Sequence, residues 1–473
     1  MLHNNIDRFR RCLVLLFMLL IPVAFDNSVA ESSGDARWYL LHWTALILTA
    51  GYLFQEKEKG PLRIPAIALI IFFLLALAAE SMAWSVNLYK SWWSLKHATG
   101  YAALFWFVYV LRGGLWWRAL LWMVAWGAGF NAALGIAQAN GIVLFGNYFE
   151  QASVPAGTLA NKNLLGSYLV VTLPAVLYLM ISSRRWIARI SAGAVLIAGV
   201  TALLYVHSIA SWIAVLCAGF FLMAWSFRSK RVVVAEVICM AVVCVALVGT
   251  KKMQQSETRL AYNINGLAIV KDHPQGGVGL GAFKTIYGFY RNAIIDTPAG
   301  GFSKTTQPSR IHNDLMQAFV ELGIAGGLTY IAIFVVLIAM AWRVGTAMSM
   351  CLISGVIGLG INSLMDFPLQ LPMAPIALSV FAGIITGLYV DKMGARLWNI
   401  PRYIYALLAM LAVVGGLFIF QDDWNRRVGS QCLRASMSLC LDGDKERALA
   451  NLEQSFDYYP WNSRLYEYAV ISK

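Results

Sequence analysis

The chain alternates long apolar blocks with shorter polar segments over most of its 473 residues. A helix needs about 20 apolar residues to cross the hydrocarbon core of a bilayer. The pattern therefore predicts an all-α integral membrane protein with about 12–13 transmembrane helices, one large outer loop and a small helical tail. The predicted spans lie near residues 12–25, 37–54, 64–80, 98–111, 116–137, 163–182, 187–206, 209–227, 232–249, 315–341, 346–364, 370–390 and 403–420.

These thirteen spans place the N-terminus inside and the C-terminus outside. Pro368 and Pro372 interrupt the weakest pair, so totals of twelve or fourteen also fit. The first block has a basic start and a Ser28-Val29-Ala30 segment that resembles a signal-peptide cleavage site. We expect it to be retained as a span; cleavage would leave the remaining topology unchanged.

The charge distribution supports this topology. The chain is 59% hydrophobic and only 13% charged, with a formal net charge of +13. Soluble domains carry roughly 25% charged residues. Lys and Arg concentrate in every second short loop, as the positive-inside rule expects of cytoplasmic loops. Much of the basic charge is therefore topological, and we expect no nucleic-acid partner.

Four regions follow from the pattern. Residues 1–250 form about nine spans, 251–313 a large outer loop, 314–420 further spans and 421–473 a helical tail. Within the loop, Leu260, Ile264, Leu267 and Ala268 recur at helical spacing, which indicates an amphipathic helix on the membrane surface.

The tail resembles part of a tetratricopeptide repeat. Asp442-Gly443-Asp444 indicates a turn between two helices, and Ala448, Leu452, Phe456 and Pro460 follow at the spacing of a repeat's second helix. A single repeat cannot bury its own apolar face. We expect it to dock on the membrane domain or on a partner.

The outer loop contains the residues most suited to chemistry. Its cations suit an anionic headgroup such as a phosphate or diphosphate, although a surface attracted to anionic membrane lipids would have the same composition. They are Lys251, Lys252, Arg259, Lys271, Lys284, Arg291, Lys304 and Arg310.

His312 ends the same loop, directly before an apolar helix. A neutral imidazole there is able to accept a proton from a hydroxyl, with Asn313 or Asp314 orienting it. A histidine at a helix start is also common in a purely structural role.

Several segments together resemble the O-antigen ligase and polymerase superfamily. They are His312-Asn313-Asp314-Leu315-Met316-Gln317 with Glu321-Leu322-Gly323, the preceding Arg259, Asp272-His273-Pro274 and Gly277-Val278-Gly279-Leu280-Gly281, an earlier Gly157-Thr158 with Asn161 and Asn163, and Asp366-Phe367-Pro368-Leu369-Gln370. The last resembles a segment of polysaccharide-polymerase-like members.

The resemblance implies a multi-pass glycosyltransferase of the bacterial inner membrane, with its active site facing the periplasm. Such enzymes move a glycan from undecaprenyl diphosphate to an acceptor hydroxyl without a nucleotide sugar, cofactor or metal. Arg259 matches the arginine that holds the diphosphate, and His312 matches the histidine that activates or positions the acceptor. Substrate-binding candidates beside them are Asn161, Lys162, Asn163, Arg291, Arg310, Asn313 and Asp314.

One position departs from the family pattern. Family members carry a Ser-Arg-Gly-Ala-type motif where this chain has Ser208-Ile209-Ala210-Ser211, so isoleucine replaces an arginine. Either Lys162, Arg291 or Arg310 supplies the missing charge, or diphosphate binding is weaker.

Three functions remain open at this stage. A polymerase would extend a lipid-linked glycan, which we favour slightly because of the tail and the Asp366 segment. For such an enzyme, the partner expected for the tail is a chain-length regulator or another assembly protein. A ligase would pass the glycan to lipid A core or to a protein. A flippase or an inactive scaffold is the alternative outside the enzymes.

Overall fold

The computed structural model describes residues 2–26, 35–55, 62–142, 144, 155–159, 161–227, 253–290, 308–394, 398–400 and 402–460. Fifteen α-helices lie in this part of the chain, together with short 3-10 turns and two strands of three residues each. The all-α fold prediction is confirmed, apart from this small ribbon. The span predicted at 232–249 and the candidate Arg291 lie outside the described residues.

The chain forms two compact units. The terminal unit comprises Met1–Gly60, Phe145–Glu150 and Pro401–Lys473. The core unit comprises Pro61–Leu144 and Gln151–Ile400. All described candidate site residues belong to the core unit.

The terminal unit contains α1 (Leu2–Leu20), η1 (Ile21–Val23), α2 (Asp35–Gln55), α15 (Arg402–Leu441) and α16 (Lys445–Tyr458). Gly443, with φ 83°, makes the turn between α15 and α16, and the Asp444 side chain caps α16. Leu433 and Leu452 are buried together between these two helices. The domain boundary predicted at 420–421 lies inside α15, because this helix continues past its apolar half into the polar tail.

The core unit is a bundle of helices with α6 and α14 as its most enclosed spans. Strand β1 (Leu62–Ile64) pairs antiparallel with β2 (Trp398–Ile400) and thereby joins the chain before α3 to the chain after α14. The α-helices are α3 (Ala66–Glu80), α4 (Leu88–Val110), α5 (Gly114–Ala139), α6 (Lys162–Ser182), α7 (Trp186–Val206), α8 (Ile209–Phe227), α10 (Met253–Asp272), α11 (Phe283–Tyr290), α12 (Asp314–Val344), α13 (Ala347–Ser363) and α14 (Met373–Met393). Two 3-10 turns, η3 (Ser81–Ala83) and η6 (Pro368–Gln370), follow α3 and α13.

Twelve of the thirteen predicted spans overlap described helices. Seven segments in the described residues are long and apolar enough to cross a membrane: Ala66–Ala83, Gly114–Ala139, Lys162–Ser182, Trp186–Val206, Ile209–Ser226, Asp314–Val344 and Met373–Met393. The apolar α13 is shorter, with 17 residues. The chain is therefore a multi-pass membrane protein, while the total number of spans stays a prediction.

The start of α4 differs from the sequence prediction. The predicted spans at 64–80 and 98–111 leave residues 81–97 as a loop, but the helix begins at Leu88, ten residues before the predicted span at 98. Asn87 caps it by accepting a hydrogen bond from the Lys90 backbone N–H, at 3.0 Å. Trp93 and Lys96 are buried in this added part. The hydropathy pattern did not predict these turns, because their polar residues lower the mean hydropathy of the segment. The helix nevertheless continues there, since it packs inside the bundle.

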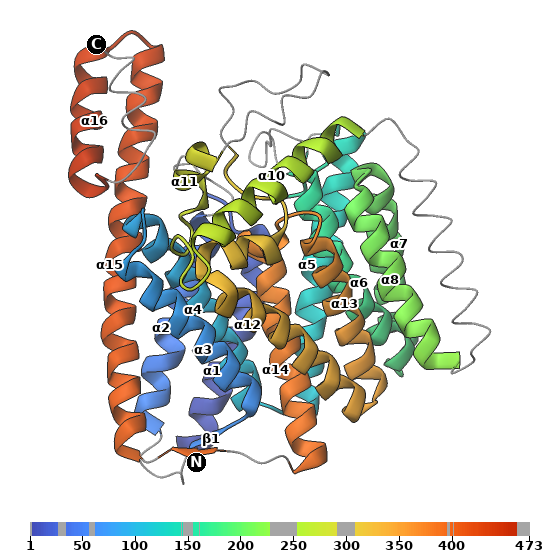
Figure 1. The fold of residues 1–473 in the computed structure, drawn as a ribbon. Helices are drawn as coiled ribbons and strands as arrows, with labels where there is room; N and C mark the ends of the chain where they lie inside the picture. Colours follow the sequence, from blue (N-terminus) through green and yellow to red (C-terminus); the bar gives the residue numbers. More distant parts are fainter. Residues whose placement is uncertain are drawn as a thin grey trace. The chain divides into compact units, whose positions relative to one another are not determined.

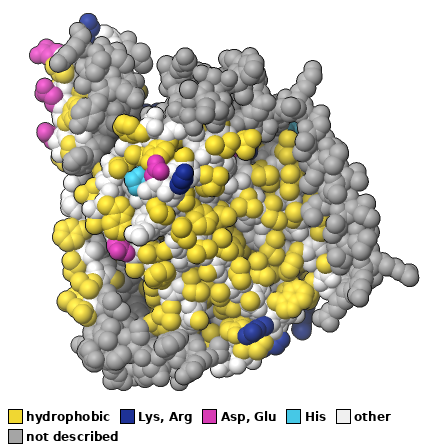
Figure 2. Space-filling model, viewed as in Figure 1, with side chains coloured by type: hydrophobic (Ala, Val, Ile, Leu, Met, Phe, Trp, Pro, Cys, Tyr) yellow, Lys and Arg dark blue, Asp and Glu magenta, His cyan; other side chains and the backbone are white. Residues whose placement is uncertain are grey.

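The surface of the core unit matches a lipid environment. Figure 2 shows a broad hydrophobic face around α12, with Lys and Arg side chains at its lower edge. Exposed apolar residues of α12 include Ile324, Leu328, Val335 and Trp342. Arg343 lies in the last turn of the same helix. Exposed apolar side chains bounded by cations are typical of a membrane-spanning segment and its interface.

Helix α10 runs obliquely across one end of the bundle (Figure 1). It spans Met253–Asp272, and its Tyr262 and Ile269 are buried in a cluster with residues of the following loop and α12. Its predicted apolar stripe faces outward, since Leu260, Ile264 and Leu267 are all exposed. An exposed stripe fits a helix that contacts the membrane surface on one side and the bundle on the other.

Candidate functional site

The site is built around the kinked start of α12. Gly323 interrupts the helical geometry with φ 68° and ψ −169°, which releases backbone groups on either side of it. The Val278 and Gly279 N–H groups donate to the carbonyl oxygens of Val320 and Glu321, both at 3.0 Å. The Ile324 N–H donates to the Pro274 carbonyl at 2.9 Å. The kink therefore allows residues 274–281, the glycine-rich segment, to form backbone hydrogen bonds with α12.

The glycines of this segment allow the close approach. Gly277, Gly279 and Gly281 all have positive φ, which L side chains rarely adopt. A Cβ atom on Gly277 would collide with the Glu321 backbone. The Glu321 carboxylate accepts from the Gly281 N–H at 2.7 Å and from the Gln317 amide at 2.9 Å. The glycine motif is thus a packing element that lets the backbone lie directly against α12.

His312 lies at the start of this arrangement. With φ 59°, it is one of two non-glycine residues with positive φ in the described ranges, the other being His207. Its Nδ1 lies 3.2 Å from Oδ1 of Asp366, a residue 54 positions away. The imidazole side chain is 30% exposed, whereas the Asp366 side chain is 3% exposed. The carboxylate is thus enclosed, and the histidine it contacts is open to the outside.

Arg259, on α10, approaches the same aspartate. Its Nη1 donates to the Met365 carbonyl at 2.6 Å, and its Nη2 lies 3.9 Å from Oδ2 of Asp366. Its side chain is also 30% exposed. The two residues that the sequence singled out, Arg259 and His312, therefore meet at one buried carboxylate, and each keeps an accessible part.

Aromatic rings hold the imidazole in position. Tyr262 stacks on His312 with ring centroids 6.2 Å apart and planes at 21°. Phe367 meets His312 edge to face at 4.7 Å. The Arg310 guanidinium lies 4.8 Å from the centroid of the same Phe367 ring. Arg310 is therefore a neighbour of the site, with its charge directed over an aromatic face.

Asn313 and Asp314 have supporting positions. We expected one of them to orient His312, but the structure gives that contact to Asp366. Asn313 caps α12 through the Met316 N–H and donates to the Asn263 side chain at 2.9 Å. Asp314 accepts from the Leu369 N–H at 3.0 Å and so fixes the turn that follows Asp366. This difference arises because the side chain of a helix cap points back to its own helix or to the packed loop.

The N-terminus of α6 lies on the same side of the bundle. Asn161 caps this helix by accepting from the N–H groups of Asn163 and Leu164, and Lys162 is its first residue. One turn later, the Ser167 hydroxyl donates to Asn362 at 2.9 Å, near the end of α13. The helix also contacts η6. These candidates thus lie beside the segment that carries Asp366, without a direct contact to His312 in the described residues.

Ile209, where this chain differs from the family motif, is the first residue of α8. Two residues later, the Ser211 hydroxyl accepts from the Asn362 amide at 3.4 Å, so that α8 is joined to the end of α13. The position where the family carries arginine therefore lies at the end of α8 that contacts the end of α13, close to Asp366. Isoleucine at this position supplies no charge.

Asp366, Phe367 and Tyr262 were not among the predicted site residues. Asp366 lies between two predicted spans, yet it is only 2% exposed. The sequence signal was present in the Asp366-Phe367-Pro368 segment, which falls between two spans on the predicted outer side. In the described ranges, no group of three or more His, Cys, Asp or Glu side chains is placed to hold a metal ion.

Comparison with known families agrees with the resemblance seen in the sequence. Residues 193–331 match the family model described as O-antigen ligase. The match includes both Arg259 and His312 and ends before Asp366. No curated protein matches the chain. Members of this family are ligases and polymerases that transfer glycans at the membrane. The protein is thus a multi-pass membrane protein that carries an O-antigen ligase family domain at residues 193–331.

Proposed function

We propose that this protein is an inverting glycosyltransferase that moves a glycan from undecaprenyl diphosphate to an acceptor hydroxyl at the periplasmic face. The observation that carries the proposal is the convergence of Arg259 and His312 on the Asp366 carboxylate, at 3.9 and 3.2 Å. A cation and a base that share one buried orienting group suit a displacement reaction, which needs charge stabilisation on one side and proton removal on the other.

His312 acts on the acceptor in this mechanism. The Asp366 carboxylate accepts a hydrogen bond from Nδ1–H, which leaves the lone pair of Nε2 available. Nε2 takes the proton of the acceptor hydroxyl while its oxygen attacks the anomeric carbon. The tight environment of Tyr262 and Phe367 limits rotation of the ring, so the base is oriented before the substrate arrives.

Arg259 acts on the donor. As the new glycosidic bond forms, the bond between the anomeric carbon and the diphosphate oxygen breaks, and the electron pair leaves with the diphosphate. The exposed part of the guanidinium stabilises this charge through charge-assisted hydrogen bonds. The long contact to Asp366 leaves Arg259 able to turn toward a second anion. Arg310 and Lys162 supply further positive charge near the same end of the bundle.

We favour a polymerase, in which the acceptor is another lipid-linked glycan. The Asp366-Phe367-Pro368 segment, which resembles polymerase-like members, provides the carboxylate at the centre of the site. A ligase would use the same residues on lipid A core or on a protein.

A gene-deletion strain tests the function. Loss of the chain-length ladder, with a single repeat unit left on the carrier, is the result expected for a polymerase. Accumulation of full-length unattached polymer would instead assign a ligase. Purified protein that moves labelled lipid-linked glycan across liposomes without forming a glycosidic bond would overturn the enzyme proposal in favour of a flippase.

A further inference from the structure

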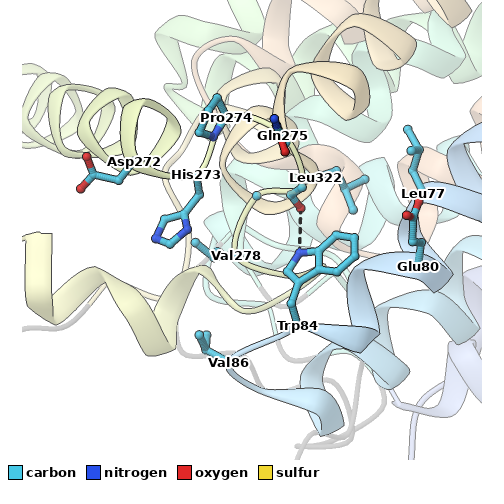
Figure 3. Close-up of a pocket in the computed structure, with 12 residues that line it drawn as sticks. Leu77, Glu80, Trp84, Val86, Asp272, His273, Pro274, Gln275, Val278 and Leu322 are labelled. Atoms are coloured by element: carbon cyan, nitrogen blue, oxygen red, sulfur yellow. Dashed lines mark hydrogen bonds between the residues drawn. The ribbon is translucent and has the colours of Figure 1, made fainter.

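A hollow in the core unit lies outside the cluster of Arg259, His312 and Asp366. It has a volume of about 640 Å³ and lies between the end of α3 and the segment after α10. Pockets of about 300–1,000 Å³ are the usual size for small-molecule sites. Figure 3 shows Trp84, Leu77 and Glu80 on the α3 side and Asp272, His273 and Gln275 on the other.

The lining suits a sugar unit. A pyranose has an apolar face of C–H groups and a rim of hydroxyls. The half-exposed Trp84 ring offers an apolar surface, and the carboxylates of Glu80 and Asp272 are acceptors for hydroxyl donors. Gln275 both donates and accepts. No Lys or Arg is among the described residues that line the hollow, so a phosphate or another anionic group would lack a cationic partner.

The polar and aromatic groups are held in place before a ligand binds. The Trp84 indole N–H donates to the Gly276 carbonyl at 3.2 Å, and a Cβ atom on Gly276 would collide with the indole ring. Desolvation and the nearby Asp272 carboxylate raise the pKa of the Tyr290 phenol above its usual value. The rings of His273 and Tyr290 meet edge to face, with their centroids 6.5 Å apart. Such preorganisation lowers the entropic cost of binding.

Helix α10 connects this hollow to the reacting groups. Arg259 and Asp272 lie in the same helix, 13 positions apart. A rise of 1.5 Å per residue separates their Cα atoms by about 20 Å. This distance exceeds one sugar unit, so a ligand that reaches both places is a chain of several units.

We propose that this hollow is a distal subsite for the glycan, which holds a neutral sugar unit several residues away from the bond being formed. The inference rests on the proposed function, because it assumes that the cluster at Asp366 carries out glycan transfer. It adds that the enzyme retains a growing chain through a contact remote from the chemistry. A contact of this kind raises the chance that a chain is extended again before it dissociates.

Two substitutions test the subsite with little change in shape: Glu80→Gln and Asp272→Asn. Matched controls are Glu453→Gln and Asp457→Asn, both on the exposed surface of α16. The full-length proteins are placed in nanodiscs, and binding of the free glycan, released from its lipid by hydrolysis, is followed by saturation-transfer NMR. The same variants are expressed in the deletion strain, where the chain-length distribution is read from a gel.

The expected result is about tenfold weaker glycan binding in each pocket variant, the effect of one charge-assisted hydrogen bond, with unchanged binding in the controls. Chains should become shorter while the first transfer still occurs. Unchanged binding and unchanged chain length in both pocket variants would overturn the subsite. So would a loss seen only in Trp84→Ala, because Trp84 would then merely support the Gly276 segment. Retention of phosphatidylethanolamine by the wild type, in place of glycan and lost in both variants, would assign the hollow to a lipid and also overturn the proposal.

The two proposals fail in different ways. A defective catalytic cluster abolishes all transfer but leaves free-glycan binding sensitive to Glu80 and Asp272. A defective subsite shortens chains but leaves the first transfer intact. Normal transfer by a His312 variant would therefore contradict the proposed mechanism, while the subsite would still be tested by glycan binding to the Glu80 and Asp272 variants.

Discussion

Two clusters in this molecule pair a histidine and an arginine with aspartates, and they differ in how far each is open to solvent. In the terminal unit, His42 Nδ1 lies 2.7 Å from Asp423, with both side chains at 1% exposure or less. Beside it, Arg426 contacts Asp35 at 3.0 Å and donates to the Tyr459 hydroxyl at 3.1 Å. These groups are enclosed, and their hydrogen bonds are short.

In the core unit, the same residue types are arranged differently. Asp366 is buried, but both of its partners, His312 and Arg259, are 30% exposed, and their contacts are longer. In the enclosed cluster the polar groups stabilise the fold, since a buried charge requires a partner of opposite charge. A half-open pair keeps a base and a cation available to a ligand. Residue type alone therefore does not distinguish the enclosed cluster from the accessible one, whereas the exposure of the histidine and arginine side chains does.

The largest expected effect concerns His312. Because its φ is positive, His312→Asn is a better variant than alanine: asparagine tolerates this backbone conformation but is not a base. Loss of a general base should lower the transfer rate by about 10²–10⁴-fold. The measurement is transfer of a labelled lipid-linked glycan by purified protein. His207→Asn, at the other described histidine with positive φ, is the matched control and should keep normal activity. Near-normal transfer by the His312 variant would falsify its assignment as the base.

An intermediate effect is expected at Arg310. If this residue compensates for Ile209, Arg310→Ala should lower transfer by about 10–100-fold through loss of a charge-assisted contact. Adding Ile209→Arg to that variant should recover much of the loss, because it returns a cation to the same end of the bundle. Transfer kinetics of the single and double variants check this. If the double variant transfers no faster than Arg310→Ala alone, position 209 is not equivalent to the position of the family arginine.

The smallest effect on transfer is expected in the terminal unit. Asp35→Ala leaves the buried Arg426 charge without this carboxylate and should cost about 3–5 kcal/mol of folding stability. Activity per folded molecule should stay unchanged. Denaturant-induced unfolding and transfer assays on the same preparation separate the two quantities, with the exposed Asp457→Ala as control. A stable Asp35→Ala protein with low transfer would contradict the contrast between the two clusters.

The sequence predicted most of the helices because the relevant property is local. Apolar blocks define α5, α6, α7, α8 and α14 within a few residues of their observed ends. The prediction was poorer for α4 and α15, where polar residues occupy a helix that continues beyond its apolar part. Hydropathy measures transfer into lipid and not the packing of one helix on another.

For the candidate site, the sequence singled out a polar segment between predicted spans and two of its residues, Arg259 and His312, because residue type and motif spacing are carried by short stretches of chain. The contact of both residues with Asp366, 54 positions beyond His312, is visible only in the folded chain. The same holds for Asp314, which accepts a hydrogen bond from the Leu369 N–H in the turn after Asp366. Such contacts depend on how α10, α12 and α13 pack, and burial is a property of the whole fold that no local pattern contains.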